Sequence, residues 1–139
     1  MSVNGFHVVD SHVHLLPGRL GDKVRAFFDA GVSARTPLAY PNDHDKVVQT
    51  LASEGVDEIW TLPYAHKPGV AEGLNVAAAA TVQQFADSPQ HVIGGATVHP
   101  GDDDAVTIVQ TAIDDLGLRV LQLHCSVGSF SIEDAGLAS

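Results

Sequence analysis

The sequence predicts an α/β domain built on a parallel sheet. Short apolar segments alternate with longer segments of helical periodicity, in the order β-α-α-β-α-β-α-β. Strands that are joined through helices are expected to be parallel, with right-handed crossovers. The last apolar segment, residues 118–123, is nearly continuous, which is typical of a strand buried on both faces. We expect residues 1–139 to form one domain.

The individual elements follow from periodicity and from helix stop signals. Val8 and Val9 are β-branched and favour the first strand, and the expected strands are residues 6–11, 57–62, 91–98 and 118–123. A break at residues 17–18 precedes the first helix, and residues 33–41 are expected to form an irregular loop. The expected helices are residues 22–30, 42–55, 70–85 and 102–116, with Asn42 and Asp102 as N-caps and Gly31, Gly55 and Gly117 as stops.

Composition excludes several classes of function. The net charge is −10, and no cluster of lysine and arginine exists that could neutralise phosphates, so no nucleic-acid or anionic-membrane partner is expected. No segment approaches the length of a membrane span, and the N-terminus lacks the basic and apolar regions of a secretory signal. Cys125 is the single cysteine, which fits a protein of the reducing cytoplasm.

Histidines are concentrated at one edge of the expected sheet. The chain has eight, and five of them fall at or just after the carboxyl end of a strand: His12, His14, His66, His99 and His124. In parallel α/β sheets this edge is where ligands and catalytic groups gather. The distribution therefore predicts a functional site there.

His12 and His14 are the candidate metal ligands. Side chains two positions apart on a strand share a face, so the two imidazoles can hold one metal ion. Asp10 is expected on the same face but deeper, where a supporting carboxylate is favoured over a ligand.

The remaining residues at this edge are expected to be neighbours of the site. For His66, His99 and His124, a capping or hydrogen-bonding role is favoured over metal ligation. Gln122 is expected to share a face with His124 and to make a hydrogen bond within the sheet interior. No catalytic residue is assigned.

Several segments together resemble a known family. These are residues 10–14 (Asp-Ser-His-Val-His), residues 96–100 (Ala-Thr-Val-His-Pro), residues 121–124 (Leu-Gln-Leu-His) and residues 62–67. They resemble the amidohydrolase superfamily, in its "amidohydrolase 2" branch. The resemblance implies a TIM-like (β/α)8 barrel with a divalent metal, most often zinc, held in part by His12 and His14. It also implies hydrolysis of amide or ester bonds through metal-activated water, or decarboxylation of aromatic acids.

The sequence departs from the family pattern in two ways, and the second limits the fold that we expect. The branch often has lysine where Gln122 stands, and a full barrel takes about 250 residues. We therefore expect the first four strand–helix units of a barrel, truncated before strands five to eight. A pairing with a complementary C-terminal half and a homo-oligomer are the alternatives to truncation. The expected function is the N-terminal portion of a metal-dependent hydrolase of a small molecule. A related decarboxylase, a non-catalytic metal-binding half-barrel and a poorly folded remnant are its alternatives.

Overall fold

The computed structural model describes residues 5–31 and 42–133, and it has the expected α/β fold. Its strands are β1 (Val9–Val13), β2 (Glu58–Thr61), β3 (His91–Thr97) and β4 (Val120–Gln122). Its helices are α1 (Gly18–Ala30), α2 (His44–Ser53), α3 (Ala71–Gln84), α4 (Ala105–Asp114) and α5 (Cys125–Gly128). The predicted order of elements is confirmed, with the short α5 added after β4. The loop expected at residues 33–41 lies outside the described residues.

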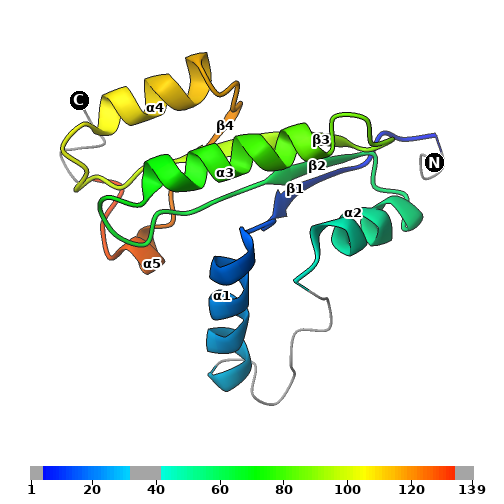
Figure 1. Cartoon of the computed structure of the whole chain (residues 1–139), viewed down its shortest axis with the longest axis horizontal. Helices are drawn as coiled ribbons and strands as arrows, with labels where there is room; N and C mark the ends of the chain where they lie inside the picture. The colour runs from blue at the N-terminus through cyan, green and yellow to red at the C-terminus, as the bar shows by residue number, and fades with distance from the viewer. Residues whose placement is uncertain (1–4, 32–41, 134–139) are drawn as a thin grey trace.

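The four strands form one all-parallel sheet in the order β1-β2-β3-β4, which curls like half of a barrel. Each strand pairs with the next one along the chain, so every connection is a crossover through helices. In Figure 1, α3 lies across the sheet and α1 extends away from it. Because all strands run the same way, their carboxyl ends lie at one edge, where the site residues are found.

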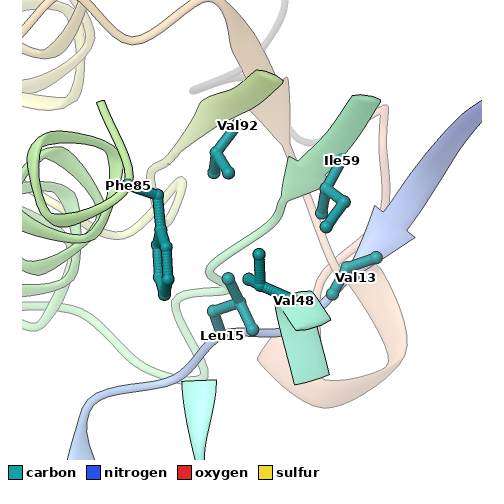
Figure 2. Packing of buried hydrophobic residues seen from close by; sticks show 6 residues of the cluster. All are labelled: Val13, Leu15, Val48, Ile59, Phe85 and Val92. Carbon is teal, nitrogen blue, oxygen red and sulfur yellow. The ribbon is translucent and has the colours of Figure 1, made fainter. Parts of the chain in front are cut away.

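One face of the sheet is covered by helices. Figure 2 shows the main core cluster, in which Val13, Ile59 and Val92 from three strands meet Val48 of α2, together with Leu15 and Phe85. A second cluster, of small residues and one leucine, joins α3, β3 and α4: Ala78, Ala96, Ala112 and Leu118. The alanines let the helices approach the sheet closely, as close packing of an interior requires.

The other face of the sheet is open in the described part of the chain. Trp60 and Ile93 alternate with the core residues Ile59 and Val92, so they lie on this second face, and both remain partly exposed. At the β1 edge, Val9 is 40% exposed. A sheet with one covered and one open face is the geometry expected for part of a barrel.

The helix starts differ from those expected. Helix α1 begins at Gly18 rather than at residue 22, because Pro17 serves as its N-cap and its carbonyl accepts the N–H groups of Leu20 and Gly21 at 2.9 Å. Asp43, not Asn42, caps α2, and its carboxylate accepts the N–H of Lys46. Among the described residues, no helix combines the length and the apolar character that a membrane crossing requires.

Candidate metal centre

His12 and His14 face each other at the carboxyl end of β1. Their Nε2 atoms lie 3.2 Å apart, and their rings meet edge to face with centroids 4.9 Å apart. His12 is exposed, whereas His14 is partly buried. The shared face that the sequence predicts for the two imidazoles is present in the structure.

The tautomer of His14 is set by the strand beside it. Its Nδ1 lies 2.7 Å from the carbonyl oxygen of Leu62, just after β2. Since a carbonyl only accepts, Nδ1 carries the proton and donates it, and Nε2 is left with a lone pair directed at His12. Leu62 precedes Pro63, which restricts its backbone and holds the acceptor in place. A histidine that donates its second ring N–H to a carbonyl is the usual arrangement of a metal ligand.

The environment keeps His14 neutral. Partial burial is the main cause that lowers the pKa of His14 below its usual value, and the charges of His12 and His124 lower it further. The hydrogen bond to Leu62 opposes this shift but is the smaller influence. A neutral imidazole is the form that binds a metal ion.

This shift predicts a loss of stability in acid. Because the pKa of His14 is lower in the folded protein, the unfolded chain binds its proton more tightly. The contribution of His14 is therefore complete above the unfolded pKa of about 6.5, and it is lost as the pH falls from there towards the folded pKa. Urea unfolding of the wild type and of His14→Asn across this range should give diverging curves, with the steeper acid loss in the wild type. Parallel curves would contradict the prediction.

Alternation along β1 predicts that Asp10 shares a face with the two histidines, but the strand register places it on the other face. Between Asp10 and Val13, β1 advances three positions while β2 advances two, which is a β-bulge. Asp10 is in register with Ile59 of the helix-covered core, and Val13 lies in that core as well. The Asp10 carboxylate instead accepts the backbone N–H of His12 at 3.1 Å. It supports the bulge that presents His12.

The pair fits two positions of a metal ion's coordination sphere. Zinc–imidazole bonds are about 2.0–2.1 Å long, so two nitrogens on one zinc lie at most about 4.2 Å apart, and the Nε2–Nε2 distance of 3.2 Å falls inside this limit. Within residues 5–31 and 42–133, however, no group of three or more histidine, cysteine, aspartate or glutamate side chains is placed to hold a metal. The described residues supply two nitrogen donors here, one fewer than the protein ligands of a typical catalytic zinc site.

A hollow of about 120 Å³ adjoins His14. Tyr64 stands at its edge, with its ring centroid 5.3 Å from that of His14 and 5.3 Å from that of His124. Helix α1 contributes Phe28 and Arg25 to the wall of the same hollow. His124 accepts the N–H of Val127 on Nδ1 at 3.4 Å, so its Nε2 carries the proton. The hollow thus combines aromatic surface with N–H donors.

His99 is held by hydrogen bonds at both ring nitrogens. Its Nε2 lies 2.9 Å from the carbonyl of Gly128, and its Nδ1 accepts the N–H of Gly101 at 3.0 Å. The ring is buried against Phe130. With Nε2–H donated and Nδ1 accepting, neither nitrogen faces His12 or His14.

Asp102 joins two of the loops that follow the strands. Its carboxylate accepts the N–H of Gly69 at 2.6 Å and that of His99 at 2.9 Å. The cap expected from Asp102 on α4 is wrong, because the N-cap position is Asp104, whose side chain makes no capping bond. The loops after β2 and β3 are the elements that Asp102 stabilises.

Among the described residues, neither His66 nor Gln122 makes a side-chain hydrogen bond or ring contact with the histidine pair. His66 is exposed in the loop after β2. Gln122 is half-buried, and its backbone carbonyl accepts the hydroxyl of Thr97 at 3.0 Å. The sequence does not predict a role for Tyr64 or for α1 at this site, because α1 meets the hollow only through the fold. The one signal in the sequence is that Tyr64 directly follows the expected strand 57–62 and Pro63, at the edge where the histidines lie.

Comparison of the chain with protein-family models, with curated proteins and with solved structures gives no significant match.

Proposed function

We propose that this chain forms part of a metal-dependent hydrolase of the amidohydrolase type, on a TIM-like barrel, with His12 and His14 as metal ligands. The observation that supports it best is the convergence of the two Nε2 atoms at 3.2 Å, with the lone pair of His14 directed into the gap by the Leu62 carbonyl. The substrate is a small molecule with an amide or ester bond. The single Cys125 favours a cytoplasmic setting.

Different residues of the chain would have different roles in such a site. A divalent cation, zinc by preference, would polarise the substrate carbonyl and make bound water more acidic. His14 stays neutral and fixed in orientation through Leu62, while Asp10 holds the backbone of His12. Tyr64 packs against His14 and limits the access of water to its ring. The hollow beside His14 is the place for the substrate.

A zinc titration of the purified chain tests the proposal. We expect uptake of zinc with affinity that depends on both histidines, measured by competition with a chromophoric chelator. Magnesium should compete poorly, because imidazole nitrogen is a ligand for transition metals and zinc rather than for magnesium. A chain that folds but takes up no zinc would contradict the proposed function.

A second candidate, decarboxylation of aromatic acids, is favoured by the wall of the hollow. Arg25 and Phe28 come from α1, and Tyr64 lies opposite beside His14. A guanidinium binds carboxylates through a planar set of N–H donors, and aromatic rings pack against one another. The Arg25 side chain is 25% exposed and its Nε lies 3.9 Å from the Asp29 carboxylate. An aromatic carboxylate would find both a cation and ring surface here.

Benzoate binding distinguishes this candidate. Arg25→Gln should weaken binding of benzoate to the zinc-loaded chain by about 10- to 150-fold, since a charged hydrogen bond contributes about 1.5–3 kcal/mol. Binding of the neutral analogue benzamide should change little. Arg19→Gln is the matched control, because Arg19 lies exposed on the same helix and does not line the hollow. Equal benzoate affinity of Arg25→Gln and the wild type, measured by NMR titration, would exclude the role of Arg25.

A further inference from the structure

We propose that a second copy of this chain closes the half-barrel, with β4 of each copy pairing with β1 of the other. The two His12–His14 pairs then meet at one mouth. The part that concerns metal binding rests on the proposed function. The pairing of strands stands on the sheet alone.

The sheet has two edges that can pair with each other. β1 and β4 are its outermost strands, and all four strands are parallel. Edge strands present backbone N–H and C=O groups that bind further strands, and closure into a ring removes both edges. A closing piece must bring four more parallel strands that have helices on the outer face. A second copy, turned by a two-fold rotation about the barrel axis, meets both requirements.

The two edges also complement each other in character. Val9 on β1 is 40% exposed and Leu121 on β4 is 45% exposed. Val9 is in register with Glu58 and Leu121 with Ala96, so the two side chains lie on opposite faces of the sheet, and a neighbouring strand would cover each on its own face. The β1 segment, residues 8–13, carries Asp10, and the β4 segment, residues 118–123, carries Arg119. A β4-to-β1 joint therefore brings opposite charges together. Pairing of like edges would bring like charges together.

Closure also completes the set of metal donors. Each chain has two imidazole nitrogens at the carboxyl end of β1, and in its described residues no third metal-binding side chain is placed beside them. The interior of an eight-stranded barrel is just wide enough to be filled by side chains, so groups on opposite strands meet across it. The rotation places both pairs at the same mouth. Three of the four imidazoles from two chains can supply the protein ligands of a catalytic zinc site and leave its fourth position open for water.

Trp60 offers a built-in reporter of closure. It is the single tryptophan of the chain, and it lies partly exposed on the open face of β2, with Nε1 donating to Glu58 at 2.7 Å. Closing the barrel turns this face into the interior. The fluorescence of Trp60 should therefore shift to shorter wavelength when two chains associate.

Sedimentation equilibrium of the full chain, with and without zinc, tests the proposal. We expect a species of twice the chain mass, a blue-shifted Trp60 emission and one zinc for two chains. Leu121→Lys and Val9→Lys place a charge on either edge and should each halve the mass and abolish this stoichiometry. Val76→Lys is the matched control: Val76 is 56% exposed on α3, away from both edges, and this variant should stay dimeric. Circular dichroism identifies any variant that fails to fold. If one of Leu121→Lys and Val9→Lys does not fold, the mass of the other variant tests the pairing.

The outcomes separate the two proposals. A monomer that binds one zinc per chain would overturn the dimer and leave the proposed function standing. A dimer that binds no zinc would support the strand pairing and contradict the proposed function. A Leu121→Lys or Val9→Lys chain that folds and remains dimeric would overturn the pairing of β4 with β1.

Discussion

Replacing Asn75 by leucine is expected to lower the free energy of unfolding by about 3 kcal/mol, since two buried backbone groups lose their partners. Asn75 lies on α3, is 1% exposed, and pairs with both backbone groups of Thr97. Its Oδ1 accepts the Thr97 N–H at 2.8 Å, and its Nδ2 donates to the Thr97 carbonyl at 3.0 Å. Leucine has nearly the same shape, so the loss would arise from the unpaired N–H and C=O rather than from a cavity.

Urea unfolding followed by circular dichroism measures this effect. Gln83→Leu is the matched control, because Gln83 is exposed on the same helix and its replacement should change stability by less than about 0.5 kcal/mol. Equal stability of Asn75→Leu and Gln83→Leu would contradict the role given to Asn75. The loss should extend to the site, since the Thr97 hydroxyl accepts the Ala65 N–H and donates to the Gln122 carbonyl.

Replacing His14 by alanine should weaken zinc binding by about 100-fold or more, because the change removes a ligand and even changes to supporting residues cost 10- to 100-fold. His14 is the better anchored of the two imidazoles, through its 2.7 Å contact with the Leu62 carbonyl. His12→Ala should have a similar effect on affinity. The measurement is competition with a chromophoric chelator at neutral pH.

His91→Ala is the control for the zinc measurement. His91 begins β3, and its Nδ1 contacts Glu58 at 3.1 Å at the opposite end of the strands from His14. Its replacement removes one imidazole from the chain and leaves the paired Nε2 atoms in place. If His91→Ala and His14→Ala weaken zinc binding equally, zinc is bound non-specifically by surface histidines.

The order of elements could be predicted because the information is local. Helical and strand periodicities in 118–123 or 70–85 need no knowledge of the rest of the chain, and the parallel sheet follows from the alternation. The same holds for His12 and His14, whose shared face depends on a separation of two residues. The face on which Asp10 lies could not be predicted, because alternation along the sequence does not reveal the bulge in β1.

The surroundings of the histidine pair depend on contacts between distant segments, and these could not be predicted. Asn75 and Thr97 form hydrogen bonds although they are 22 positions apart in the sequence, and Leu62 and His14 do so at a separation of 48 positions. The start of α1 could not be predicted because proline and glycine at residues 17–18 indicate a break, although a proline just before a helix is compatible with its first turn. Arg25 meets the hollow only through the placement of α1.

The hydrogen bonds of Asp102 and His99 have a consequence for redesign. Asp102 joins Gly69 to His99, and His99 in turn donates to Gly128, so the segments after β2, β3 and β4 are connected in series. Exchanging any one of these segments for a foreign sequence removes a partner from the next. A library aimed at new specificity would therefore have to vary the three segments together, or keep Asp102 and His99 fixed and diversify only the positions between them.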